Sequence, residues 1–189
     1  MTSRVLYLFG SAAPPVHDFP AVVEAAQGRG FTVCVGLTPT AAEWLSPQLA
    51  EVEQRTGHPV RSRYKKPGAA DAWPTADVIA FAPVTANSLN SWALCLTHNF
   101  AVGVVAEGIG KEIPMVAMPC VNAAYAAHPQ VPRSIETLRG AGVRVLYGDG
   151  GFVPNAPGQG RPAEYPWTLV LDAAEQASRP GYESAPGNR

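Results

Sequence analysis

Small and hydroxyl-bearing residues follow the first two apolar runs of the chain. The turn Gly10-Ser11 ends the run 5–9, and Thr38-Pro39-Thr40 follows the run 31–37. Hydroxyls and backbone N–H groups in such turns can approach a phosphate at a helix N-terminus, and a threonine there can equally cap the helix. The chain has neither a G-x-G-x-x-G turn nor a G-x-x-x-x-G-K-[ST] loop, so the sequence supports neither dinucleotide-binding nor P-loop chemistry.

Two further turns add amide side chains. The hexapeptide Pro83-Val84-Thr85-Ala86-Asn87-Ser88 follows the apolar run 77–82, and Pro119-Cys120-Val121-Asn122 follows the run 115–118. Hydroxyls can hydrogen-bond a phosphate, and a carboxamide can hydrogen-bond the polar edge of a ring. The turns therefore predict a ligand site, provided that the fold brings them to one place.

The apolar runs alternate with segments of helical spacing. We expect strands at 5–9, 31–37, 77–82, 115–118 and 143–147, with an edge strand at 58–64. We expect helices at 19–27, from Thr38 or Thr40 through 44 and on to 54, at 87–100, 133–139 and 165–177. Strands that are apolar throughout are typical of parallel sheets covered on both faces. The sequence therefore predicts a three-layer α/β fold with a doubly wound parallel sheet, which binds ligands beyond the carboxyl ends of its strands.

The length of 189 residues suits one domain. We expect that domain to span residues 1–178, with a Gly- and Pro-rich flap at 148–162 and a disordered tail at 179–189. Hydrophobic residues make up 47% of the chain and charged residues 15%, which excludes an intrinsically disordered protein. The formal net charge is −1 with no basic stripe, so we expect no nucleic-acid partner.

The three cysteines, Cys34, Cys95 and Cys120, show no C-x-x-C spacing. A secreted disulfide framework would need an even and denser set, so we interpret them as buried thiols of a cytosolic protein. The apolar run that ends at Gly10 is too short for a signal peptide or for a membrane span of about 20 residues. We therefore expect a cytoplasmic protein without a membrane partner, and no motif suggests a metal site.

The hexapeptide at 83–88 resembles the Pro-Ala-Ser-Ala-Asn-Thr motif of the homo-oligomeric flavin-containing cysteine decarboxylases. This family includes phosphopantothenoylcysteine decarboxylase and the lantibiotic-type peptidyl-cysteine decarboxylases. Pro83, Ala86 and Asn87 match the motif by identity. Thr85 and Ser88 stand where the motif has Ser and Thr, so the hydroxyl is kept at both positions.

A second stretch is similar to the family's Pro-x-Met-Asn-x-x-Met-Trp substrate clamp. Pro119 and Asn122 match it, whereas Val121, Tyr125 and Ala126 depart from it. The resemblance runs from the first strand to about residue 147, with the motifs in the family's order.

The resemblance implies an FMN site shared between subunits of a homotrimer or a multiple of three. The residues it implies for FMN are Gly10, Ser11, Thr38, Thr40, Pro83, Thr85, Ala86, Asn87 and Ser88. The residues it implies for the substrate are Pro119, Asn122 and Tyr125. Trp92, Leu96 and Phe100 form an apolar stripe at helical spacing that could serve as the interface, although a core helix is the commoner explanation of such a stripe.

One departure bears on the reaction. Members of the family carry an active-site histidine shortly upstream of the hexapeptide, but the matching stretch 64–74 has none. The remaining catalytic candidates are Asn122, His128 and His17. Acid–base work of another kind is open to Tyr64, Lys65 and Asp71. Because the histidine is missing and the clamp is altered, we expect ordinary cysteine decarboxylation to be weak or absent.

The leading hypothesis is an FMN-binding flavoprotein of this superfamily that acts on a small or peptidyl thiol or carboxylate substrate. One alternative is a non-catalytic FMN carrier or redox-sensing module. Another is an oxidative decarboxylase of a C-terminal cysteine with a rebuilt acid–base group. The flavin prenyltransferase branch shares the fold but needs a basic pocket for dimethylallyl phosphate, and Lys65-Lys66 is too little for one.

Overall fold

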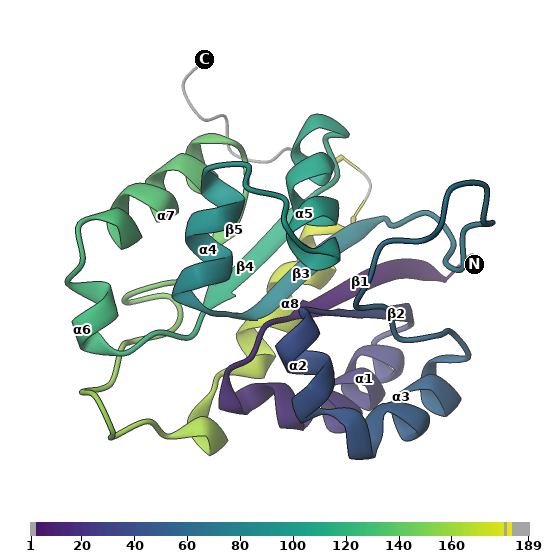
Figure 1. Ribbon diagram of the computed structural model, residues 1–189, viewed down its shortest axis with the longest axis horizontal. Helices are drawn as coiled ribbons and strands as arrows, with labels where there is room; N and C mark the ends of the chain where they lie inside the picture. The colour runs from purple at the N-terminus through teal and green to yellow at the C-terminus, as the bar shows by residue number, and fades with distance from the viewer. Residues whose placement is uncertain (1–2, 180, 183–189) are drawn as a thin grey trace.

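The computed structural model describes residues 3–179 and 181–182, which form a five-stranded sheet between two layers of helices (Figure 1). The strands are β1 (Arg4–Gly10), β2 (Phe31–Leu37), β3 (Val78–Val84), β4 (Met115–Pro119) and β5 (Arg144–Val145). Their order across the sheet is β2-β1-β3-β4-β5, and every neighbouring pair is parallel. The predicted doubly wound parallel α/β fold is confirmed.

The α-helices are α1 (Phe19–Gly28), α2 (Pro39–Trp44), α3 (Leu49–Thr56), α4 (Ala86–Ala93), α5 (Phe100–Gly110), α6 (Ala123–Ala126), α7 (Gln130–Gly140) and α8 (Trp167–Ala177). Short 3-10 helices, η1 (Pro14–Asp18), η2 (Ser46–Gln48) and η3 (Pro162–Glu164), connect some of these elements. None of the helices in the described part of the chain combines the length and the apolar character that a bilayer crossing requires.

The two faces of the sheet carry separate hydrophobic clusters. Leu6 and Leu8 of β1 pack with η1, α1, α2, α3 and α8 on one face. Phe9 of the same strand packs with α4, α5 and α7 on the other. This alternation explains why the strands read as continuous apolar runs, because side chains on both faces are buried.

The order of the strands decides where a ligand can bind. From β1 the chain runs outward to β2 and then returns to β3 on the other side of β1. The connections that leave β1 and β3 therefore diverge to opposite faces of the sheet, and in open α/β sheets this divergence leaves a crevice beyond the carboxyl ends of the two strands.

The predicted edge strand at 58–64 is wrong. Only Arg61 pairs with the sheet, through an isolated bridge in which its N–H donates to Val35 O at 3.0 Å and its carbonyl accepts from Leu37 N at 2.8 Å. Beyond this point Tyr64 packs on Phe100 of α5, with ring centroids 5.9 Å apart. The segment leaves the sheet edge after one residue and crosses to the α5 layer.

The predicted helix at 87–100 is also wrong, because two helices occupy this stretch. Cys95, two residues after the end of α4, adopts a left-handed conformation with φ of 55°. Asn99 then caps α5, since its Oδ1 accepts a hydrogen bond from Val102 N at 3.0 Å. Trp92 and Phe100 are buried while Leu96 is 55% exposed, so the three do not form one stripe.

Smaller departures concern the last strand and the thiols. Strand β5 pairs with β4 only at Arg144 and Val145, which is shorter than predicted. Only Cys34 is buried as expected, whereas Cys95 is exposed and Cys120 is half-buried; all three are free thiols. The predicted disordered tail lies mostly outside the described residues.

Candidate functional site

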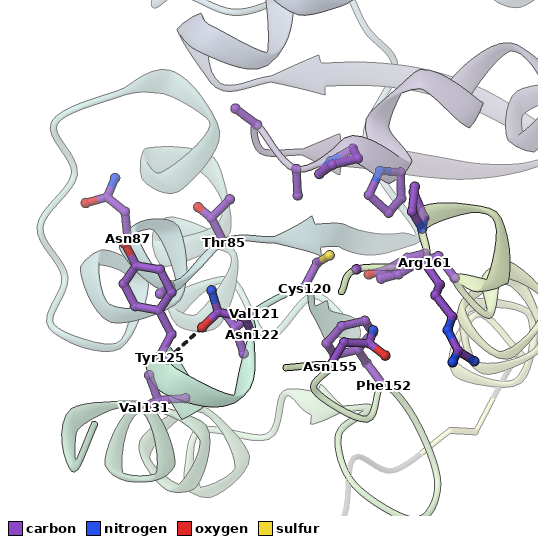
Figure 2. A pocket seen from close by; sticks show the side chains of 18 of the residues that line it. Thr85, Asn87, Cys120, Val121, Asn122, Tyr125, Val131, Phe152, Asn155 and Arg161 are labelled. Carbon is purple, nitrogen blue, oxygen red and sulfur yellow. Dashed lines mark hydrogen bonds between the residues drawn. The ribbon is translucent and has the colours of Figure 1, made fainter. Parts of the chain in front are cut away.

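A cavity of about 720 Å³ opens beyond the carboxyl ends of β1, β3 and β4. Four segments line it: the turn into η1, the start of α4, the stretch from Cys120 to Val131, and the flap. Figure 2 shows Thr85, Cys120 and Asn122 between Asn87 and Tyr125 on one side and Asn155 and Arg161 on the other. Among the described residues that line the cavity there is no Asp or Glu. An anionic ligand would therefore meet no repulsion from an acidic side chain of this lining.

The turns after β1 and β3 are joined by one side chain. Ser11 is 1% exposed, and its hydroxyl donates to Pro83 O at 2.8 Å while accepting from Thr85 N at 2.8 Å. Its own N–H also donates to Pro83 O at 2.9 Å. Gly10 leaves space for the ring of Phe19, which a Cβ at this position would meet at 2.6 Å. The two turns are thus held as one unit at the edge of the cavity.

The N-terminus of α4 borders the cavity. Thr85 caps the helix, since its hydroxyl accepts a hydrogen bond from Ser88 N at 3.4 Å. Thr85, Ala86 and Asn87 all line the cavity. The first N–H groups of a helix have no partner within the helix and lie at the positive end of its dipole, so this wall suits a phosphate or another anion.

The clamp and the flap are connected to each other. Asn122 caps α6 by accepting a hydrogen bond at Oδ1 from Tyr125 N at 3.0 Å (Figure 2). Ala123 N donates to the carbonyl of Asn155, in the flap, at 2.8 Å. The clamp and the flap therefore form one continuous side of the cavity.

The flap is anchored at both of its ends. Phe152 is 9% exposed and Tyr165 is 6% exposed, and their ring centroids lie 5.7 Å apart. Gly151 lies so close to the backbone of Leu146 that a Cβ would stand 2.1 Å from its carbonyl carbon. The flap therefore starts from a turn that only glycine fits.

Two ionisable side chains that line the cavity, Cys120 and Tyr165, are held in their neutral forms. Burial raises the pKa of the Cys120 thiol to about 11. Burial, and next the neighbouring Cys120, raises the pKa of Tyr165 well above its usual value, and the hydroxyl of Tyr165 donates to Met118 O at 2.7 Å. A thiol with such a pKa is a poor nucleophile at neutral pH.

The structure brings some of the predicted site residues together at the cavity and leaves others behind it. Those that line the cavity are Thr85, Ala86, Asn87, Asn122, Tyr125 and His128. Those outside the lining are Gly10, Ser11, Thr38, Thr40, Pro83, Ser88, Pro119 and His17. Thr38 is nevertheless linked to the first turn, because its N–H donates to Gly10 O at 3.0 Å.

Sequence reasoning missed several lining residues. They include Asn90, Cys120, Val131, Phe152, Asn155 and Arg161. Asn90 stands one helical turn after Ala86 on the predicted helix, so its spacing could have indicated that it shares the same face. The flap residues carry no such signal, because their positions depend on tertiary contacts of an aperiodic segment.

The upstream segment that lacks the family histidine does not line this cavity. Tyr64 donates to Thr97 O and Asn99 O at 3.1 Å each, and Lys65 pairs with Asp71. Of the histidines that the chain does have, His17 is exposed and stacks on Trp44, with ring centroids 6.2 Å apart. His98 is exposed in the link between α4 and α5. Only His128 of the four lines the cavity.

His128 is oriented by the start of α7. Its Nδ1 accepts a hydrogen bond from Gln130 N at 3.1 Å, so in the neutral ring the proton resides on Nε2. Across the described residues, no group of three or more His, Cys, Asp or Glu side chains could hold a metal ion.

Comparison with known proteins gives a consistent result. The family model described as Flavoprotein matches residues 4–175. The structure is similar to TvaF, an FMN-dependent cysteine decarboxylase from thioviridamide biosynthesis, with a TM-score of 0.68, 19% identity and coverage of 94% of this chain and 99% of that one. It is also similar to SpaF, another FMN-dependent cysteine decarboxylase, with a TM-score of 0.65, 26% identity and coverage of 92% and 98%. For MrsD from Bacillus sp. HIL-Y85/54728 the TM-score is 0.67, the identity 21% and the coverage 93% and 96%. No curated protein matches the chain significantly.

Proposed function

Because this chain belongs to the Flavoprotein family, we propose that it binds FMN in the cavity and acts there on a small or peptidyl substrate with a thiol and a carboxylate. SpaF, at 26% identity, is an FMN-dependent cysteine decarboxylase. The observation that carries the proposal is the cavity itself, which lies where β1 and β3 part, borders the α4 N-terminus and has no carboxylate in its described lining.

The residues around the α4 N-terminus fit the phosphate of FMN. Thr85 and Ala86 lie at the positive end of the α4 dipole, and the small residues Ala12 and Ala13 face the same cavity from the turn after β1. Ser11 engages the N–H groups of Ala13 and Thr85, so the N–H groups at the start of α4, those of Ala86 and Asn87, are the ones left in this cradle to reach phosphate oxygens. Ser11 supports this cradle from behind, since its hydroxyl is engaged by Pro83 and Thr85.

The opposite side of the cavity fits a flat ring and a polar substrate. Val121, Phe152 and Tyr125 supply apolar and aromatic surface, and the amides of Asn87 and Asn122 lie beside it. The Oδ1 atom of Asn122 is engaged by Tyr125 N, so its amide nitrogen is the atom left to donate to a ligand. A donor there is complementary to a substrate carboxylate.

Oxidative decarboxylation of a cysteine removes two hydrogens and carbon dioxide from the substrate, and FMN when bound supplies the two-electron acceptor. The residues of this chain bind and orient the substrate, through Asn122 and the aromatic surface of Tyr125. His128 is the one imidazole of the described lining, and its Nε2–H can donate a hydrogen bond to the substrate. Because it is solvent-exposed and the stretch 64–74 lies elsewhere, we expect turnover of ordinary cysteine substrates to be slow.

We propose that the protein assembles as a homotrimer or a multiple of three, with each FMN site close to a neighbouring copy. Leu94 and Leu96 are 56% and 55% exposed in the link between α4 and α5, a stretch of apolar surface that a partner would cover. Three free thiols fit a reducing compartment such as the cytoplasm.

The first test is a fluorescence titration of the purified protein with FMN, in which saturable quenching of the flavin is expected. A colourless protein that takes up no FMN contradicts the proposal. The second test incubates the FMN-loaded protein with C-terminal cysteinyl peptides under air and follows the loss of carbon dioxide and two hydrogens by mass spectrometry. FMN binding without any turnover would identify a carrier rather than an enzyme.

A further inference from the structure

The start of α7 orients an amide side chain that the sequence motifs do not include. Gln130 Nε2 donates to Ser134 Oγ at 3.0 Å, and Ser134 Oγ donates to Asn90 Oδ1 at 2.8 Å. Ser134 is 0% exposed, so water does not compete for its hydroxyl. The Ser134 oxygen accepts the hydrogen bond from Gln130, and its single hydrogen is donated to Asn90. The side-chain oxygen of Asn90 therefore faces Ser134.

The amide nitrogen of Asn90 is consequently the atom available to the cavity. Asn90 is half-buried and lines the cavity, and no hydrogen bond from its Nδ2 to another described residue is present. Trp92 Nε1 is the one fully buried polar side-chain atom without a hydrogen-bond partner among the described residues. Asn90 Nδ2 is therefore not fully buried, and a ligand or water can reach it. An amide nitrogen in this position needs an acceptor from a ligand or from water.

Asn90 and Asn122 thus share one arrangement. Each has its side-chain oxygen engaged by the protein, by Ser134 Oγ and by Tyr125 N, and each leaves its nitrogen for the cavity. Asn90 lies four residues after Ala86 on α4, about 6 Å further along the helix axis from the phosphate cradle. His128, also a donor at Nε2, lines the same cavity and is oriented by Gln130 too.

We propose that Asn90 is a specificity-determining residue that donates from Nδ2 to the substrate carboxylate, and that Ser134 is its positioning residue. The proposal rests on the proposed function, because it assumes that the cavity takes a carboxylate-bearing thiol beside FMN. The absence of Asp and Glu from the described lining agrees with an anionic group at this place. A hydrogen bond to a charged acceptor is stronger than one to a neutral amide, so Asn90 should discriminate between an acid and its amide.

The test uses the FMN-loaded full chain and two probes, N-acetyl-L-cysteine and N-acetyl-L-cysteine amide, with affinities measured by isothermal titration calorimetry. The wild-type protein should bind the acid about tenfold more tightly than the amide. Asn90→Ala should remove most of this preference, and Asn90→Asp should reverse it, because a second carboxylate repels the acid. Ser134→Ala should lower the preference to an intermediate value.

Matched controls separate recognition from structure. Thr137→Ala removes another α7 hydroxyl, which donates to Arg133 O outside the cavity, and should leave the acid-to-amide ratio unchanged. FMN affinity, measured on every sample, should stay within about twofold of wild type, since a general loss of structure would lower it for all variants. If Asn90→Asp fails to fold, Asn90→Ala and Ser134→Ala still decide the matter.

An unchanged acid preference in Asn90→Ala would overturn the inference while leaving FMN binding intact. Equal binding of the two probes by the wild-type protein, or binding of neither, would overturn it as well. A wild-type protein that takes up no FMN would instead remove the proposed function on which the inference rests.

Discussion

The hydroxyl of Ser11 accepts a hydrogen bond from the backbone N–H of Thr85 at 2.8 Å, across 74 residues of sequence. It also donates to Pro83 O, so one buried side chain fixes the turn after β1 against the turn after β3. The sequence pattern suggested that this hydroxyl binds phosphate. In the structure the hydroxyl uses its hydrogen and one acceptor position within the protein, so its effect on a ligand is exerted through Thr85.

We expect Ser11→Ala to destabilise the protein by about 1–3 kcal/mol, because the N–H of Thr85 loses its buried acceptor. The FMN affinity should fall together with the stability, since Thr85 caps the helix that borders the site. Ser91→Ala is the matched control, because Ser91 is 6% exposed and its hydroxyl, which takes part in none of the hydrogen bonds between described side chains, is not among the fully buried polar atoms without a partner. Urea unfolding and FMN titration measure the two effects. Equal stability of Ser11→Ala and Ser91→Ala would contradict this prediction.

Asn87→Asp should weaken FMN binding about tenfold, because a carboxylate would face an anionic ligand in a cavity that otherwise has no acidic lining. The thermal midpoint should not fall, since an acidic residue in the first turn of α4 stabilises the helix. Asn99→Asp makes the same change at the N-terminus of α5, outside the cavity, and should retain wild-type affinity. Undiminished FMN occupancy in Asn87→Asp would place Asn87 away from the cofactor.

The three thiols should react at very different rates with an alkylating reagent at pH 8. Cys95 is exposed and should react first, whereas burial raises the pKa of Cys34 to about 12 and should delay its reaction until unfolding. Cys120, with a pKa of about 11, should react slowly and be protected further by FMN, because it lines the cavity. Peptide mapping by mass spectrometry with and without FMN measures this order. Equal labelling of Cys120 in both samples would argue against FMN in the cavity.

Stability should decline at alkaline pH. Burial raises the pKa of Cys34 and of Tyr7 to about 12 and that of Cys120 to about 11, above the usual values of 9.0 for cysteine and 10.0 for tyrosine. The folded state therefore holds more protons than the unfolded state from about pH 9 upwards, and the free energy of unfolding falls as pH rises through about 11–12. Thermal unfolding between pH 7 and 12 measures it. The stability of Cys34→Ala should decline less steeply with pH. A wild-type stability that does not change between pH 7 and 12 would contradict the raised pKa values.

Light scattering should give the mass of three chains or a multiple of three. Leu96→Glu should shift the protein towards monomers, because a charge would enter the surface that we assign to the interface. Leu169→Glu is the control, since Leu169 is 39% exposed on α8, away from the link between α4 and α5. An FMN-loaded wild-type monomer would be inconsistent with the shared site.

The strands and the turns could be predicted because burial on both faces leaves a direct trace in the sequence. Strand β2 was predicted to the residue, and β1 and β3 to within two residues. The break between α4 and α5 could not be predicted, because Trp92, Leu96 and Phe100 keep helical spacing across it. The break includes a left-handed residue, but this residue is Cys95 and not a glycine, so the sequence gives no signal for it.

The sequence indicated the residues of the candidate site that lie in turns and helix caps. It did not indicate those whose positions depend on tertiary contacts. The motif at 83–88 indicated Thr85 and Asn87, and both line the cavity. The orientation of Asn90 depends on Ser134, 44 residues away, and the flap wall depends on the anchoring of Phe152. Such contacts leave no periodic pattern, so the sequence shows the residues but not their arrangement.

The carboxylate-free lining of the cavity also bears on electron affinity. The α4 N-terminus and the free amide nitrogens present partly positive charge to the cavity, and its described lining has no Asp or Glu. Arg161 also lines the cavity, although its guanidinium pairs with Glu164 at 3.4 Å. Such an environment stabilises the more negatively charged, two-electron-reduced form of a bound flavin relative to water. We therefore expect the midpoint potential of bound FMN to lie above that of free FMN, which would make this protein a stronger oxidant than its cofactor in solution.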